Sequence, residues 1–277
     1  MSKTLKPNGE LIKLDTHNIH IYRKGAKDKP KIIFMSGSGT VSPVFDFKIL
    51  YEKLQDDFRI IVIEKFGYGY SDICDYPCHI DSIISLYKKV LNLINEEGPY
   101  ILAPHSMSGL EALRWKQIFP DDICAIIGLD MAIPSVYQSW TTKELKKRIN
   151  LMKIAKKLNF HKLPFLFWGN HSALTKEERK QLILLKNRNS FNKCFINEAN
   201  EVLSNANIVA QEKIECPMLL FSSNGKQTSQ NWIEYQKDFA KNLNAKLISF
   251  DCGHYLHHFK SYEISIAIKQ FTNELKT

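Results

Sequence analysis

Residues 100–113 read YILAPHSMSGLEAL, an apolar strand that runs through a tight turn of small residues into a helix, with Ser106 at the apex. Such a turn needs small neighbours two positions either side, because larger side chains would collide across it. Pro104 and Ser108 occupy those positions. The helix that begins near Met107 adds unpaired N–H groups and the positive end of its dipole. The stretch predicts a serine nucleophile, with an ordinary strand-turn-helix corner as the alternative.

The alternation of strand and helix continues on both sides of this stretch. Residues 11–22 predict an antiparallel hairpin that turns at 15–18. Short β-branched or apolar runs are typical of buried parallel strands and stand at 31–35, 60–63, 100–103, 124–129, 217–221 and 246–250. Helical patterns stand at 45–54, 80–95, 110–119, 230–242 and 262–275. The sequence predicts an α/β fold with a mostly parallel central sheet flanked by helices.

Strand-like runs disappear between residues 134 and 212, where the sequence is helical and rich in lysine. This segment is expected to be a helical cap inserted into a core made of residues 1–133 and 213–277. We expect its aromatic side chains to roof an apolar pocket, or else to pack the cap onto the core. They are Phe160, Phe165, Phe167, Trp168 and Phe191.

The composition of the 277 residues, 44% hydrophobic and 24% charged, is that of a globular protein and excludes disordered and fibrous classes. No run resembles a signal peptide or a membrane span, so a cytoplasmic protein without an integral membrane segment is expected. The six cysteines are then expected to remain thiols. Cys74, Cys78 and His79 lie close together, but no second pair accompanies them, and we predict no metal.

The formal net charge of +9 comes mostly from lysine. Its densest cluster, at residues 143–157, is interleaved with apolar residues at helical spacing and indicates a solvated amphipathic helix. Attraction to an anionic membrane surface or a polyanion is the alternative. The motifs of nucleic-acid-binding modules are absent, so no nucleic-acid partner is predicted. The oligomeric state is left open.

Chemistry on a parallel sheet collects at the carboxyl ends of the strands. The loop at 36–40, Ser-Gly-Ser-Gly-Thr, follows such a strand and can bring backbone N–H groups close to a substrate. It matches neither a dinucleotide fingerprint nor a P-loop. After the last predicted strand, residues 251–254 place His254 in a tight loop at the same edge, where it is predicted to act as a base. His257 and His258 are assigned to packing or to helix entry.

Together these motifs resemble the α/β-hydrolases with a cap, and the resemblance spans nearly the whole chain. It rests on the loop at 36–40, on Phe-Gly-Tyr-Gly-Tyr-Ser-Asp at 66–72, on the serine turn at 105–109, and on Gly253-His254. Ser36 stands where many relatives carry histidine, and Pro104 and Ser108 stand where glycine is usual. These departures leave every reacting group in place.

In most relatives the acid of the catalytic triad follows the seventh strand, but here the loop at 222–231 contains no carboxylate. Asp130 follows the sixth strand, a position that some relatives use, and is predicted to be the acid. The alternative for Asp130 is to anchor the start of the insertion. Glu234 and Asp238 are weaker candidates because they lie within the following helix.

The resemblance implies acyl transfer to water from an ester or related small-molecule substrate, with no cofactor. Ser106 would be the nucleophile and His254 the base, and the N–H groups of Met107 and Ser38 would form the oxyanion hole. A serine argues against dehalogenase and epoxide-hydrolase chemistry, for which the family uses an aspartate at the turn. Amide or peptide hydrolysis and non-catalytic ligand binding remain as alternatives.

Overall fold

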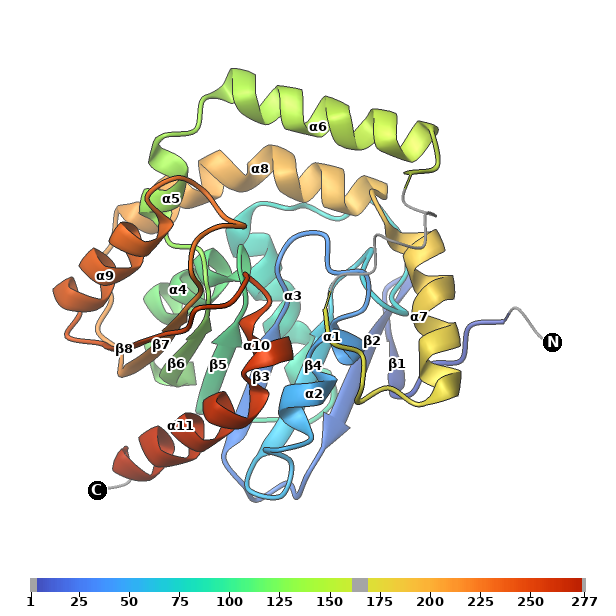
Figure 1. Ribbon diagram of the computed structural model, residues 1–277. Coiled ribbons are helices and arrows are strands. Elements are labelled where there is room, and N and C mark those ends of the chain that lie inside the picture. The colour runs from blue at the N-terminus through green and yellow to red at the C-terminus, as the bar shows by residue number, and fades with distance from the viewer. Residues whose placement is uncertain (1–3, 161–168, 276–277) are drawn as a thin grey trace.

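The computed structural model describes residues 4–160 and 169–275, and within them eight strands form one sheet in the order β1-β2-β4-β3-β5-β6-β7-β8 (Figure 1). β1 and β2 form the predicted hairpin, β2 pairs antiparallel with β4, and the remaining pairs are parallel. The predicted fold class is therefore confirmed. The strands are β1 (Glu10–Leu14), β2 (His17–Lys24), β3 (Lys31–Met35), β4 (Arg59–Glu64), β5 (Tyr100–Pro104), β6 (Ile123–Leu129), β7 (Met218–Ser222) and β8 (Lys246–Ser249).

Both faces of the sheet are buried along β3 to β7, which explains why these strands are mostly apolar rather than alternating. In β3, Ile33 and Met35 join the hydrophobic cluster on one face, while Ile32 and Phe34 join the cluster on the other. Because successive side chains of a strand point to opposite faces, each strand contributes to both cores. The sheet is thereby held in a register that brings its carboxyl ends to one edge.

Helices cover the two faces of the sheet. Residues of α3 and α4 belong to one hydrophobic cluster, whereas residues of α1, α2 and α11 belong to the other. The predicted helix at 45–54 is instead two four-residue helices, because α1 ends at Phe47 and α2 begins there. These helices are α1 (Pro43–Asp46), α2 (Lys48–Tyr51), α3 (Ile80–Leu93), α4 (Ser108–Ile118), α9 (Trp232–Asn242), α10 (Leu256–Phe259) and α11 (Ser261–Glu274), with a 3₁₀ turn at Pro120–Asp122.

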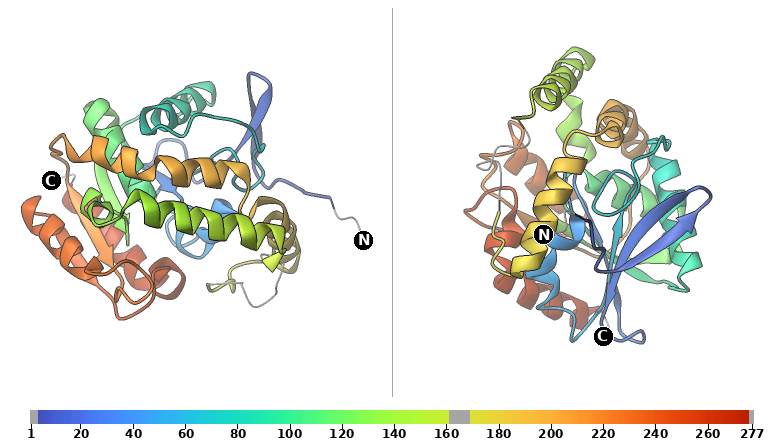
Figure 2. Two further views of the ribbon diagram at one scale, coloured as in Figure 1. Left: turned by 90° about the horizontal axis from the view of Figure 1, so that it is seen from above. Right: turned by 90° about the vertical axis from the view of Figure 1, so that its right-hand side faces the viewer.

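Four helices lie between β6 and β7: α5 (Pro134–Gln138), α6 (Thr142–Lys157), α7 (Lys176–Asn189) and α8 (Lys193–Ala210). α8 packs against α4 and α5, and α6 lies on α8 as the layer farthest from the sheet (Figures 1 and 2). Capping boxes at Thr141 and Thr175 start α6 and α7. Only Leu145 and Ile149 of α6 are buried, so this helix rests on its neighbours through a narrow face.

Glu64 ends β4 and organises the loops on either side of it. Its fully buried carboxylate bonds to the ring of His20 (2.9 Å) and accepts from the N–H groups of Tyr70 (2.8 Å) and Val44 (3.1 Å). A Cβ at Gly69 would lie 1.6 Å from this carboxylate, so glycine is required there. One side chain thus joins β2, the start of α1 and the loop after β4.

We predict that Glu64→Ala lowers the free energy of unfolding by about 3–5 kcal/mol, because it leaves His20 and two N–H groups buried without an acceptor. Urea unfolding at neutral pH measures the change. Glu97→Ala removes the same charge from an exposed site and is expected to shift stability by less than about 0.5 kcal/mol. Equal losses in the two variants would contradict the role of Glu64.

Candidate active site

Ser106 lies between β5 and α4 with a φ of +55°, in the left-handed region that residues other than glycine rarely adopt. The loop at 36–40 packs directly against it. A Cβ built at Gly37 would lie 2.6 Å from Ser106 Cβ, so this close approach requires glycine. The turn holds a partly exposed serine in the backbone geometry expected of a nucleophile elbow.

Ser108 stands at the position of the turn where glycine is usual, and its hydroxyl group is fully hydrogen-bonded. Ser108 is buried, and its Oγ donates to the carbonyl of Met35 (2.7 Å) and lies 2.9 Å from the carbonyl of His105. Pro104 pairs with Met35 at the end of the β3–β5 ladder. A Cβ at Gly109 would lie 2.1 Å from the carbonyl oxygen of Ala132. The departures at 104 and 108 are accommodated, whereas Gly109 cannot be exchanged without moving the chain after β6.

The structure brings His254 and Asp130 together from the ends of β8 and β6. His254 Nδ1 lies 2.6 Å from Asp130 Oδ2. The other carboxylate oxygen, Oδ1, accepts from the N–H of Ser223 (2.9 Å) and from Trp232 Nε1 (2.7 Å). Asp130 is completely buried, and these three donors compensate the cost of placing a carboxylate there.

Hydrogen bonds of both the ring and the backbone fix the orientation of His254. Its Nδ1–H donates to Asp130, which leaves Nε2 as the acceptor nitrogen of the neutral ring. Its backbone N–H donates to Gln227 Oε1 (3.0 Å), and its carbonyl accepts from His105 Nε2 (3.2 Å). The tautomer is the one that a general base needs if it is to take a proton at Nε2.

Two backbone N–H groups near Ser106 have no acceptor. Within the described residues, neither Met107 nor Ser38 donates its N–H to a backbone or side-chain oxygen. Met107 stands at the N-terminal end of α4, where the helix dipole is positive. Ser38 is exposed and adjoins Gly37, the residue that packs on Ser106. Both N–H groups are therefore available to an anionic oxygen.

Ser106 and His254 line the same cavity, which has a volume of about 220 Å³. Neither Phe160 nor Phe191 is part of its lining, so the prediction that they roof the pocket is wrong for this cavity, and Phe165, Phe167 and Trp168 lie outside the described residues. Phe160 lies three residues beyond the end of α6 and is 50% exposed. The described residues that do line the cavity are Ser106, Ala132, Val136, Tyr137, Trp140, Arg148, Gln227, Thr228, Ser229, Trp232 and His254.

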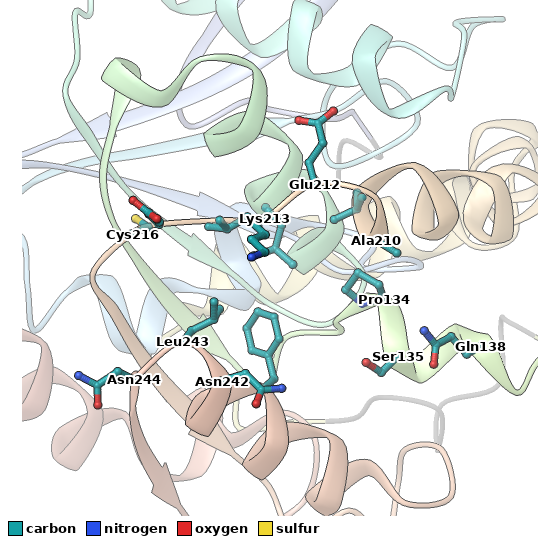
Figure 3. A pocket seen from close by; sticks show the side chains of 15 residues that line it. Pro134, Ser135, Gln138, Ala210, Glu212, Lys213, Cys216, Asn242, Leu243 and Asn244 are labelled. Carbon is teal, nitrogen blue, oxygen red and sulfur yellow. The ribbon is translucent and has the colours of Figure 1, made fainter.

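A larger cavity of about 750 Å³ lies between α5, the end of α8 and α9 (Figure 3). Its described lining contains none of Ser106, His254 and Asp130. Cys216 is its only thiol among these residues, and burial raises the pKa of that thiol to about 11. The thiol is therefore not a reactive nucleophile at neutral pH, and the smaller cavity remains the better candidate for catalysis.

Comparisons with known proteins agree with this architecture. The chain is 29% identical over 247 residues to the uncharacterized protein YbdG of Bacillus subtilis, which covers 85% of this chain and 75% of that protein. It is 27% identical over 139 residues to epoxide hydrolase 1 of Caenorhabditis elegans, which covers 47% of this chain and 33% of that protein. No protein-family model matches the chain.

A thermophilic esterase from Thermogutta terrifontis superposes on the structure with a TM-score of 0.74 and 15% identity, covering 97% of this chain and 100% of that one. The chain has the α/β-hydrolase fold. Ser106 follows β5 of this fold, in the turn that leads into α4. None of the described helices combines the length and apolar character needed to cross a membrane.

A cluster of histidines lies beside the turn that contains Ser106. From the sequence, His257 and His258 are assigned only to packing or to helix entry. His257 Nε2 and His258 Nε2 each lie 3.0 Å from an oxygen of Asp46. The ring of His105 lies 4.8 Å, centre to centre, from that of His257 and 4.6 Å from that of His254. The closely spaced histidines at 254, 257 and 258 were a usable signal, but Asp46 lies 211 residues away in the chain.

Asp46, His257 and His258 present three ligand atoms within 4.8 Å of one another, a spacing that could hold a metal ion. The hydrogen bonds of His258 argue for a different role. His258 Nδ1 accepts from the N–H of Asn170 (2.8 Å), so a neutral ring carries its proton on Nε2 and donates it to Asp46. With Nε2 protonated, His258 cannot be a metal ligand through that atom. The cluster therefore ties α10 to α1.

A buried ion cluster joins α8 to the helix that follows the elbow. Lys65 Nζ bonds to Glu111 of α4 (2.6 Å) and to Glu198 of α8. Tyr87 donates to Glu111 (2.6 Å), and Tyr68 donates to Glu198. Burial alone would lower the pKa of Lys65, but the two carboxylates outweigh it and raise that pKa. Lys65 therefore stays charged and fixes α8 over the elbow helix.

Two buried histidines of the cluster make stability depend on pH. Burial, with the neighbouring rings of His254 and His257, holds the pKa of His105 well below its ordinary value. Burial also lowers the pKa of His257, although Asp46 opposes the change. The unfolded chain therefore takes up these protons first as the pH falls below about 6.5. Stability is complete above that pH and is lost as the pH falls toward the folded-state pKa values.

We predict that His105 contributes a loss of about 1.4 kcal/mol of unfolding free energy between pH 7.5 and pH 5.5, and that His257 contributes a smaller loss of the same sign. Urea unfolding at several pH values measures it. His105→Gln is expected to flatten the pH dependence by one such contribution, whereas His17→Gln, at an exposed site on β2, is expected to leave it unchanged. A pH dependence identical in wild type and His105→Gln would refute the assignment.

Proposed function

We propose that this protein is a serine hydrolase that cleaves an ester or related acyl bond through Ser106, His254 and Asp130. The observation that carries the proposal is the 2.6 Å bond between His254 Nδ1 and a buried Asp130, beside a cavity that Ser106 also lines. Three residues from the ends of β5, β6 and β8 thereby supply a nucleophile, an orienting acid and a base.

In the first step Ser106 Oγ attacks the carbonyl carbon of the substrate while His254 Nε2 takes the hydroxyl proton. Asp130 holds the ring in the required tautomer and stabilises the imidazolium that forms. The carbonyl oxygen becomes an oxyanion, which the N–H groups of Met107 and Ser38 are placed to bind. His254 then gives its proton to the leaving alcohol, and an acyl-enzyme on Ser106 remains.

In the second step water replaces the alcohol. His254 takes a proton from this water, and the resulting hydroxide attacks the acyl-enzyme through a second oxyanion at the same two N–H groups. Collapse releases the carboxylic acid and returns the proton to Ser106. The reaction needs no cofactor or metal, because the three side chains and two backbone groups provide all of the proton transfers and charge stabilisation.

Residues 134–212 act in this proposal as a cap over a core of residues 1–133 and 213–277. Support comes from the cavity, because Tyr137 and Arg148 reach it from α5 and α6, together with Trp140 between those helices. The volume of about 220 Å³ suits a small-molecule acyl substrate. The segment between β6 and β7 would then select the substrate, while the strand ends carry out the chemistry.

Ser106 also argues against epoxide hydrolysis, the activity named for one relative. The match to an epoxide hydrolase covers 47% of this chain, yet the residue at the elbow is a serine. A carboxylate nucleophile is needed to open an epoxide as an alkyl-enzyme ester, whereas a serine activated by histidine is suited to acyl carbons. The proposal therefore follows the reacting residues rather than the relative's name.

We predict that a fluorophosphonate probe labels the purified protein at Ser106 and that the protein hydrolyses 4-nitrophenyl esters. Mass spectrometry of peptides locates the label, and absorbance follows turnover of short-chain and long-chain esters. Ser106→Ala is expected to lose both labelling and turnover, while Ser85→Ala, on the exposed face of α3, is expected to keep both. A folded protein without labelling or turnover would instead indicate a ligand-binding role.

We predict that Asp130→Asn lowers kcat by roughly four orders of magnitude with little change in fold, because the amide favours the wrong tautomer of His254. Its carbonyl oxygen can still accept from Ser223 and Trp232, so circular dichroism should be unchanged. Glu234→Gln and Asp238→Asn on α9 are matched controls and are expected to retain wild-type activity. Near-normal turnover by Asp130→Asn would exclude it as the acid of the triad.

A further inference from the structure

The cavity that Ser106 and His254 line has a marked charge asymmetry. Among the described residues that line it, Arg148 is the one permanent cation and none is acidic. We propose that Arg148 binds a carboxylate carried by the substrate, so that the preferred substrate is an ester whose acyl chain ends in an anionic group. This inference rests on the proposed hydrolase function and names its substrate class.

The donors of Arg148 are not used by a protein carboxylate. Within the described residues no aspartate or glutamate lies within salt-bridge distance of its guanidinium group. The nearest acid along α6 is Glu144, one turn earlier, and its Oε2 already accepts from Thr141 N–H and Thr141 Oγ1, each at 2.8 Å. Glu144 thus closes the N-terminal cap of the helix, and Arg148 keeps hydrogen-bonding capacity for a ligand.

Aromatic residues of the cavity wall hold the guanidinium group in place. Its central carbon lies 4.4 Å from the centre of the Trp140 ring, within the range of a cation–π contact. Trp140 in turn packs edge-on against Tyr137, with ring centres 5.4 Å apart. A cation–π contact uses the face of the guanidinium group and leaves its N–H edge to donate to both oxygens of a carboxylate.

Gln227 and Ser229 also line the cavity and carry polar groups. Ser229 Oγ is inaccessible to solvent and has no hydrogen-bond partner within the described part of the chain. Gln227 uses its Oε1 to hold the N–H of His254, which leaves its amide N–H₂ as a donor. The amide group of Gln227 is therefore a further donor for an oxygen-rich substrate, whereas Ser229 Oγ is closed off from the cavity.

The size of the cavity limits the acyl chain. Its volume of about 220 Å³ is below the roughly 300–1,000 Å³ of most ligand pockets, which favours a short acyl chain with a terminal carboxylate. Mono-4-nitrophenyl adipate has such a chain. Its methyl ester has the same chain without the charge, and the pair therefore isolates the contribution of the carboxylate.

The test compares kcat/KM for these two esters, with the rate of Ser106→Ala subtracted as background. The wild type is expected to prefer the acid, and Arg148→Gln is expected to reduce the ratio of acid to methyl ester by about tenfold to a hundredfold. Arg148→Lys keeps the charge but not the planar fork and is expected to fall between the two. Lys147→Gln removes the neighbouring exposed cation, which does not line the cavity, and should leave the ratio unchanged.

The outcomes separate this inference from the proposed function. Turnover of both esters by the wild type, with the same ratio in Arg148→Gln, would overturn the assignment of Arg148 and leave the hydrolase intact. An equal fall in Lys147→Gln would also overturn it, because the effect would then come from overall charge. Turnover of neither ester, in a protein that Ser106-directed probes do not label, would remove the hydrolase function itself.

Discussion

The buried carboxylate of Asp130 is the constraint on which the arrangement of the site depends. A charge without solvent is costly unless donors surround it, and three of them come from separate parts of the chain: Ser223 after β7, Trp232 at the start of α9, and His254 after β8. Each of these donors is held in place by its hydrogen bond to the carboxylate of Asp130. Satisfying Asp130 therefore also gathers the strand ends and orients the imidazole.

A second buried charge cluster connects the segment between β6 and β7 with the core. Lys65 follows β4, Glu111 lies one turn into the elbow helix, and Glu198 lies on α8. Removing one member would leave an uncompensated charge in the interior, so the cluster strongly favours a single position of α8 over α4. The two networks have different roles, because Asp130 positions His254 and the ends of β7 and β8, whereas Lys65 positions α8 over α4.

The parts of the structure that local pattern determines were predictable from the sequence. Strands buried on both faces are continuous apolar runs, and Asp130 could be proposed because the loop at 222–231 has no carboxylate. Contacts between distant residues left no local signal. Asp46 meets His257 across 211 residues, and Arg148 lies in a lysine-rich helical pattern that reads as a solvated face. Its place in the cavity depends on how α6 docks on α8, which periodicity does not encode.

The strand ends follow from local sequence patterns, whereas the place of Arg148 depends on how helices dock. For this reason the fold indicates a reaction class more readily than a substrate. The residues proposed to react sit at strand ends held by the sheet, so removing the hydrogen-bonding oxygens of Asp130 would disturb several elements at once. Arg148 sits on α6, which buries only Leu145 and Ile149, and its charge can be exchanged at little cost to packing. Under the proposed function, substitutions on this outer helix would change substrate preference while the chemistry at the strand ends is retained, and proteins of one fold would come to act on different molecules.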